Sequence, residues 1–142
     1  MAAPIPVLDA AGVNALLRKA FPGAAPVAFP TVTEVTPGRV RVVAAYRDGL
    51  LRPGGVISGP TLMSLSDTAA YALVLAHIGD QLMAVTSSLT MNFLRGAAPG
   101  DLHAEAELLR LGRRNAVCDV RIWTEAPDRL AAHATVTYAI PQ

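Results

Sequence analysis

This chain has few charged side chains, few aromatic side chains and a single cysteine. Charged residues make up 16% of the sequence, and the net charge at neutral pH is only +1. With so small a net charge, the chain is not expected to bind nucleic acid or an acidic membrane surface by electrostatic attraction. The lone cysteine, Cys118, can form neither an intramolecular disulfide nor a multi-cysteine zinc site. We expect it to be a core thiol, because it falls on the apolar side of an alternating run.

What the chain has in quantity is small apolar side chains, mainly alanine and valine, within 142 residues. Apolar residues make up 52% of the sequence, which is enough to build the core of one domain. The low charge content also indicates that some apolar surface is buried between subunits. The N-terminus has no basic stretch and places Asp9 early, so we expect no signal peptide and a cytoplasmic protein.

The spacing of apolar residues predicts a short amphipathic helix near the N-terminus, from about residue 8 to residue 21. The two prolines of segment 22–26 make that segment a loop. We therefore expect an N-terminal helix and loop at 1–29, followed by a single domain at 30–142.

A second helix is expected from Pro60 to Ile78, where the residues are apolar on nearly every side of a helical wheel. Ser58 is a plausible N-cap, Gly79 closes the helix, and Arg52 to Gly55 form the preceding loop. Around this helix the apolar pattern has a period of two, which indicates strands. The expected strands lie near 31–36, 39–46, 86–93, 103–108, 116–123 and 130–140. Antiparallel strands and a helix apolar all round predict an α+β fold, a curved sheet wrapped around the helix.

Between Arg52 and Asp80 the chain carries one full charge, the carboxylate of Asp67. A lone carboxylate in an apolar helix costs several kcal/mol unless it is paired or hydrogen-bonded. Ionisable groups in such surroundings are over-represented among catalytic acids, bases and nucleophiles. The alternative is that Asp67 lies at a rim or is held by neighbouring hydroxyls. Because an aspartate is also costly in lipid, we exclude a membrane span.

The run VISGPTLMSLSDTA, residues 56–69, resembles the active-site segment of hotdog-fold acyl-CoA thioesterases of the PaaI-like family, in the 4-hydroxybenzoyl-CoA thioesterase superfamily. That family has a His-Gly-Gly turn, a short apolar run and then an aspartate. Four downstream segments also resemble segments of that family, and they occur in the same order and at the same spacing as in the family. They are Ala84-Val85-Thr86, Asn92-Phe93-Leu94-Arg95, Pro99-Gly100-Asp101-Leu102 and Leu111-Gly112-Arg113.

The resemblance implies an acyl thioester bound between the helix start of one subunit and residues of its neighbour. Asp67 would activate water as a general base or attack the thioester directly. The backbone N–H of Gly59 would be an oxyanion donor, which suits a helix N-terminus with its unpaired N–H groups. Ser64, three residues before Asp67, could orient the carboxylate or simply fill space.

Further residues follow from the same resemblance. Thr86 matches a position where some members place a hydroxyl that helps to position the water, although it also begins the polar face of its strand. Gly112 and Arg113 match a pair near the CoA phosphates, for which the arginine fork is suited, and equally form a charged hairpin turn. Arg95 is a lesser candidate for the same phosphates.

Three positions depart from the family. Ser58 stands where the family has histidine, Pro60 replaces the second glycine, and Arg52 replaces a polar residue near the substrate. Proline in the first helical turn leaves Gly59 and its N–H in place. The missing histidine matters more, because it removes a side chain that helps to hold the loop and the substrate carbonyl.

The resulting expectation is a homodimer, or a dimer of dimers, that hydrolyses an acyl-CoA. CoA is then part of the substrate, and no cofactor or metal is expected. The histidines His77, His103 and His133 are scattered and are interpreted as surface or structural residues. Two alternatives stay open: a non-catalytic dimer that binds acyl-CoA or another apolar ligand, and an acyl-thioester hydratase or dehydratase. The second alternative needs a histidine beside the carboxylate for proton transfer.

Overall fold

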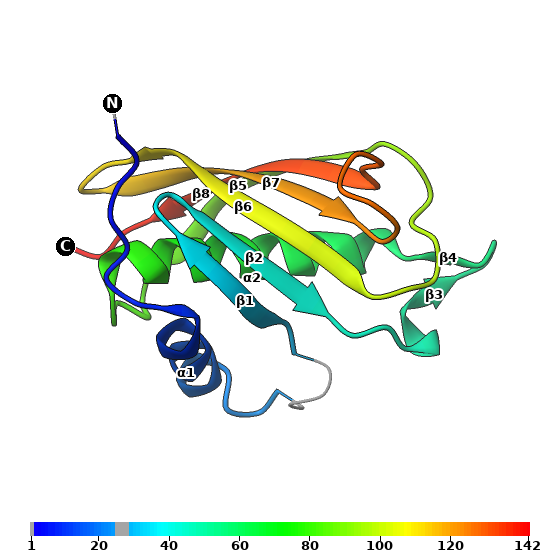
Figure 1. The fold of residues 1–142 in the computed structure, drawn as a ribbon, viewed down its shortest axis with the longest axis horizontal. Helices are drawn as coiled ribbons and strands as arrows, with labels where there is room; N and C mark the ends of the chain where they lie inside the picture. Colours follow the sequence, from blue (N-terminus) through cyan, green and yellow to red (C-terminus); the bar gives the residue numbers. More distant parts are fainter. Residues whose placement is uncertain (1, 25–28) are drawn as a thin grey trace.

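A six-stranded antiparallel sheet curves around one long helix (Figure 1). The computed structural model describes residues 2–24 and 29–142. Strand order across the sheet is β1-β2-β6-β7-β8-β5. The strands are β1 Thr31–Thr36, β2 Arg39–Ala44, β5 Val85–Phe93, β6 Leu102–Leu111, β7 Asn115–Trp123 and β8 Ala132–Ala139. The α+β fold predicted from the change of period is confirmed.

The central helix, α2, spans Gly59–Ile78 and is the core of the molecule. It begins after Ser58, carries Pro60 in its first turn, and ends at Gly79, whose φ of 82° suits glycine. By length and composition α2 could cross a membrane, but 67% of its apolar window is buried inside the protein. The helix is therefore apolar because the sheet encloses it.

The inner face of the sheet is lined with small side chains. Ala104, Ala106, Ala116 and Ala134 are fully or almost fully buried on β6, β7 and β8. Short side chains let the helix approach the sheet closely, so interior density is reached without large aromatic residues. Cys118 is buried on the same face of β7, as its place in the alternation predicts.

The N-terminal helix, α1, spans Ala10–Ala20 and shares this core. Its buried Val13 and Leu17 belong to the same apolar cluster as the central helix. The Asn14 side chain is bonded to both the N–H and the C=O of Val32, which ties α1 to β1. In the loop predicted at 22–26, residues 25 and 26 lie outside the described part of the chain.

A small hairpin precedes α2 where sequence analysis expected only a loop. Strand β3, Leu51–Arg52, pairs with β4, Val56–Ile57, after a short 3₁₀ helix at Asp48–Leu50. The turn uses Gly54 and Gly55 at positive φ, a conformation that glycine adopts without steric cost. The hairpin and the backbone bond from Ser58 N–H to the Leu50 carbonyl hold the start of α2 in place.

Candidate active site

The carboxylate of Asp67 lies on α2 and is held through one of its two oxygens. Thr86 Oγ1 donates to Asp67 Oδ1 at 2.6 Å. The Tyr138 hydroxyl donates to the same Oδ1 at 2.7 Å and also lies 3.1 Å from the Asp67 backbone oxygen. Within residues 2–24 and 29–142, no hydrogen bond reaches Oδ2. Two hydroxyl donors thus stabilise the carboxylate in its apolar helix and leave one oxygen available.

Thr86 reaches Asp67 because of a β-bulge, and this corrects the predicted face of the strand. The register between β5 and β8 shifts between Thr86 and Ser88, so that Thr86 pairs with Tyr138 and Ser88 with Thr137. Cross-strand partners share a face, and Tyr138 points toward the helix. Thr86 therefore faces α2, and it does not begin the polar face as the sequence alternation predicted. An extra residue in one strand reverses the side-chain alternation at that point.

Tyr138, on β8, is a site residue that sequence analysis missed. It is 4% exposed, and burial raises the pKa of its hydroxyl, with the hydrogen bond to Asp67 and the negative charge of Asp67 raising it further. The hydroxyl consequently stays protonated and acts as a donor. The signal in the sequence was a tyrosine on the inward face of a strand whose other inward residues are alanine and valine.

A hollow of about 570 Å³ opens beside Asp67. Its walls come from the end of α1, the middle of α2, the segment leading into β5, and β8. Three aromatic rings follow one another along it: Phe21 lies 5.9 Å from Tyr71, and Tyr71 stacks on Tyr138 at 5.6 Å between ring centroids. The hollow is therefore apolar and aromatic, with the carboxylate as its acidic group.

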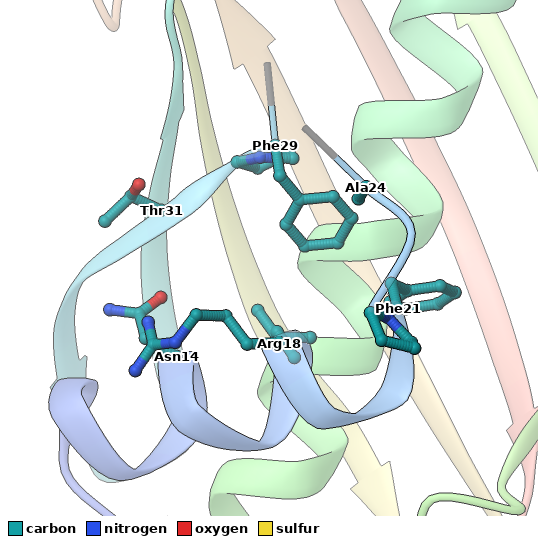
Figure 2. Close-up of a pocket in the computed structure, with 9 residues that line it drawn as sticks. Asn14, Arg18, Phe21, Ala24, Phe29 and Thr31 are labelled. Atoms are coloured by element: carbon teal, nitrogen blue, oxygen red, sulfur yellow. The ribbon is translucent and has the colours of Figure 1, made fainter. Parts of the chain in front are cut away.

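Phe21 also lines a second hollow, of about 260 Å³, between α1 and the start of β1 (Figure 2). The Phe29 ring lies 5.4 Å from Phe21, and Arg18 is the only ionisable side chain among the described residues that line this hollow. Without a carboxylate or a nucleophile beside it, the second hollow is a weaker candidate for chemistry.

Gly59 lies at the N-terminal end of α2. No acceptor within the described residues takes its N–H, and the Ser58 hydroxyl bonds to Thr61 Oγ1 at 2.7 Å without capping the backbone. Eight residues of helix separate Gly59 from Asp67, a rise of about 12 Å. Within one chain these two groups cannot meet at a single thioester carbon.

The other predicted residues lie at three places. Ser64 lines a separate hollow of about 300 Å³ together with Leu50 and Thr61, and no bond joins it to Asp67 among the described contacts. Arg52 and Arg95 are exposed, on β3 and directly after β5 respectively, and the structure does not bring them to Asp67.

The hairpin that holds Gly112 and Arg113 lies at the Asp67 end of the sheet. The register aligns Ala116 on β7 with Tyr138 on β8, and Tyr138 with Thr86 on β5. The hairpin before Ala116 therefore projects from the same sheet end as the site. Arg110, Arg113 and Arg114 line a hollow of about 310 Å³ there, and in the described part of the chain none of them forms an ion pair.

The three histidines lie away from Asp67. His77 bonds to backbone atoms of Gly38 and Leu73, His103 stacks on Trp123, and His133 pairs with Asp119. Across residues 2–24 and 29–142, no three histidine, cysteine or acidic side chains lie together as metal ligands would.

Three comparisons with known proteins agree with this geometry. Residues 54–131 match the profile of the thioesterase superfamily. A candidate thioesterase from Silicibacter sp. TM1040 is 36% identical, with a TM-score of 0.86 over 96% of this chain and 94% of that chain. The phenylacetic acid degradation protein PaaI from Thermus thermophilus, a point mutant, is 27% identical, with a TM-score of 0.68 over 79% and 93%. A candidate esterase from Saccharolobus solfataricus is 29% identical over 77% of this chain and 76% of its own length.

Proposed function

This chain belongs to the thioesterase superfamily and resembles its PaaI-like hotdog members, and we propose that it hydrolyses an acyl-CoA thioester to the free acid and CoA. The observation that carries the proposal is the Asp67 carboxylate, held through Oδ1 by Thr86 and Tyr138 at the edge of an aromatic hollow. An ionised carboxylate with one oxygen available is suited to proton abstraction or nucleophilic attack.

In the reaction proposed, Oδ2 of Asp67 takes a proton from water as the water oxygen attacks the thioester carbon. The C–S bond then breaks, and the proton passes to the departing CoA thiolate. In the second route Oδ2 attacks the carbon itself and displaces CoA as its thiolate, which takes up a proton from water. A water molecule then attacks the Asp67 carbonyl of the resulting mixed anhydride and releases the free acid. Single turnover in H₂¹⁸O separates the routes, because this attack places ¹⁸O in Asp67 and the first route does not.

The oxyanion donor, Gly59 N–H, would come from a second copy of the chain. Met63 lies midway between Gly59 and Asp67 on α2 and is exposed. A two-fold axis near Met63 sets two α2 helices antiparallel, and each Asp67 then lies opposite the Gly59 of the other copy. A donor aimed at the developing oxyanion is worth about 3 kcal/mol.

The edge of the sheet supports this homodimer. β5 has one neighbour, β8, so its outer edge is unpaired within the described sheet, and such edges favour pairing with another strand. Large apolar side chains are exposed on this strand and directly before it: Val85 at 56%, Phe93 at 54%, and Met83 at 77% in the segment leading into β5. A dimer of dimers is the larger assembly compatible with the same pairing.

For the CoA moiety we assign the hairpin at Gly112 and Arg113, because its cations project from the sheet end that holds Asp67. Arg95, Arg52 and Ser58 lie toward the other end of α2, and in the antiparallel dimer they would approach the substrate from the second copy. We further assign a cytoplasmic location, where acyl-CoA substrates occur, and no cofactor.

The test is CoA release from a panel of acyl-CoA substrates, with Asp67→Asn beside wild type. This change keeps the side-chain shape and removes the base. Asp80→Asn, which alters an exposed carboxylate paired with Lys19, is the matched control. We expect activity in wild type and in the control, and its loss in Asp67→Asn. A wild type that binds acyl-CoA without turnover, equally well after Asp67→Asn, would show a binding module, a reading favoured by Ser58 in place of the family histidine.

A further inference from the structure

We propose that Tyr138 is a positioning residue that fixes the plane of the Asp67 carboxylate so that its second oxygen faces the substrate, an inference that rests on the proposed function. Its hydroxyl and that of Thr86 converge on Oδ1 at 2.7 and 2.6 Å. The terminal torsion of an aspartate is soft and broad, so a carboxylate held by one donor alone can rotate its plane and turn its second oxygen away from the substrate. Two donors on one oxygen hold the carboxylate in a single orientation.

Tyr138 is the more rigid of the two donors. Its ring is buried and stacked on Tyr71 with an interplanar angle of 22°. Tyr71 is itself held by a 2.8 Å bond from its hydroxyl to the Leu82 carbonyl. Thr86, in contrast, is exposed on the edge strand beside a bulge. Thr86, the exposed donor, is thus accompanied by Tyr138, a donor whose ring is held in place by burial and stacking.

The effect of the Tyr138 hydroxyl on catalysis can be separated from its effect on the stability of the fold. Tyr138 and Tyr46 each donate from the hydroxyl to an aspartate oxygen, Tyr138 to Asp67 at 2.7 Å and Tyr46 to Asp48 at 2.8 Å. Tyr46 does not line the hollow beside Asp67. Tyr46→Phe is therefore a matched control for Tyr138→Phe, because both remove one hydroxyl that is bonded to a carboxylate.

The experiment measures kcat and KM for both variants, beside wild type and Asp67→Asn, together with the midpoint of urea unfolding. We expect Tyr138→Phe to lower kcat at least tenfold with KM within twofold, because the carboxylate is misplaced and binding is unaffected. Tyr46→Phe should keep kcat within twofold. 3-Fluorotyrosine incorporated in place of Tyr138 keeps the ring and the donor, and should retain wild-type kcat.

A crystal structure of Tyr138→Phe should show the Asp67 carboxylate rotated or in two orientations. The inference is overturned if Tyr138→Phe keeps wild-type kcat, if it changes KM alone, or if Tyr46→Phe loses kcat equally. Those outcomes leave the proposed function intact as long as Asp67→Asn is inactive. An inactive wild type, or an active Asp67→Asn, refutes the proposed function instead.

Discussion

His77 accepts a hydrogen bond from the backbone N–H of Gly38, with 2.9 Å between Nε2 and that nitrogen. The other ring nitrogen, Nδ1, lies 2.8 Å from the Leu73 carbonyl one turn earlier. The imidazole thus joins the end of the central helix to the turn between β1 and β2. With Nε2 accepting, the proton lies on Nδ1. The residue is buried and contributes to structure.

Replacing His77 with leucine should destabilise the fold, because it leaves the buried Gly38 N–H without an acceptor. The expected loss is about 1–3 kcal/mol in the free energy of unfolding. Urea titration measures it, with His103→Leu on the outer sheet face as the control. Activity per folded molecule should be unchanged. If His77→Leu lowered the free energy of unfolding by less than His103→Leu does, the role assigned to the bond between His77 and Gly38 would be contradicted.

Thr86→Val should lower kcat about tenfold or more, because it deletes one of the two donors to Asp67 Oδ1 and keeps the β-branched shape. Thr86→Ser retains the hydroxyl and should remain close to wild type. Steady-state kinetics on the best acyl-CoA substrate decide the matter. Equal activity in the valine and serine variants would mean that the hydroxyl has no part in catalysis.

Gly59→Pro removes the proposed oxyanion donor at a position that can accept proline. Ser58 already has ψ of 149°, the conformation that a residue before proline prefers. A Cβ at Gly59 would meet the Phe93 ring at 3.4 Å, an ordinary contact. We expect kcat to fall about 10²–10³-fold with the fold retained. Gly59→Ala keeps the N–H and is the control; a proline variant as active as the alanine variant would exclude this donor.

Mixing two inactive variants tests whether the site is shared between copies. A heterodimer of Asp67→Asn and Gly59→Pro chains has one site with both defects and one site with none. When equal amounts of the two chains are unfolded and refolded together, random pairing makes half of the dimers heterodimers. The mixture should then recover about a quarter of wild-type activity. Each variant refolded alone is the control. If both groups came from the same chain, the mixture would stay inactive.

The buried thiol of Cys118 predicts an alkaline loss of stability. Burial raises its pKa from 9.0 to about 12 in the folded protein. Between these values the unfolded chain has released a proton that the folded chain keeps, so stability falls as pH rises. The slope contributed is at most about 1.4 kcal/mol per pH unit, and it becomes negligible below about pH 8, where the unfolded thiol is also protonated. As pH rises above about 8, the free energy of unfolding of wild type should therefore fall relative to that of Cys118→Val, and below about pH 8 the difference between the two should stay constant.

Much of the framework could be predicted from local patterns. The apolar run from Pro60 to Ile78 predicted the buried helix, and the change of period to two predicted the strands. Asp67 stood out because a charge in an apolar helix needs a compensating partner. These signals are local, since each depends on residues that are neighbours in the sequence.

The contacts of the carboxylate could not be predicted in the same way. Tyr138 lies 71 residues from Asp67, and nothing near either residue marks their contact. The bulge after Thr86 reversed the face that strict alternation had given this residue. The hairpin of β3 and β4 was missed because strands of two residues are too short to show a period.

The sequence by itself determined that one isolated carboxylate would lie in an enclosed helix, because hydrophobic periodicity dictates which segments are buried. Only the tertiary structure decided how that carboxylate is satisfied and which of its oxygens stays available. Hydrogen bonds depend on direction and distance to within fractions of an ångström. That geometry arises from the register of β5 against β8 and from the packing of both on α2.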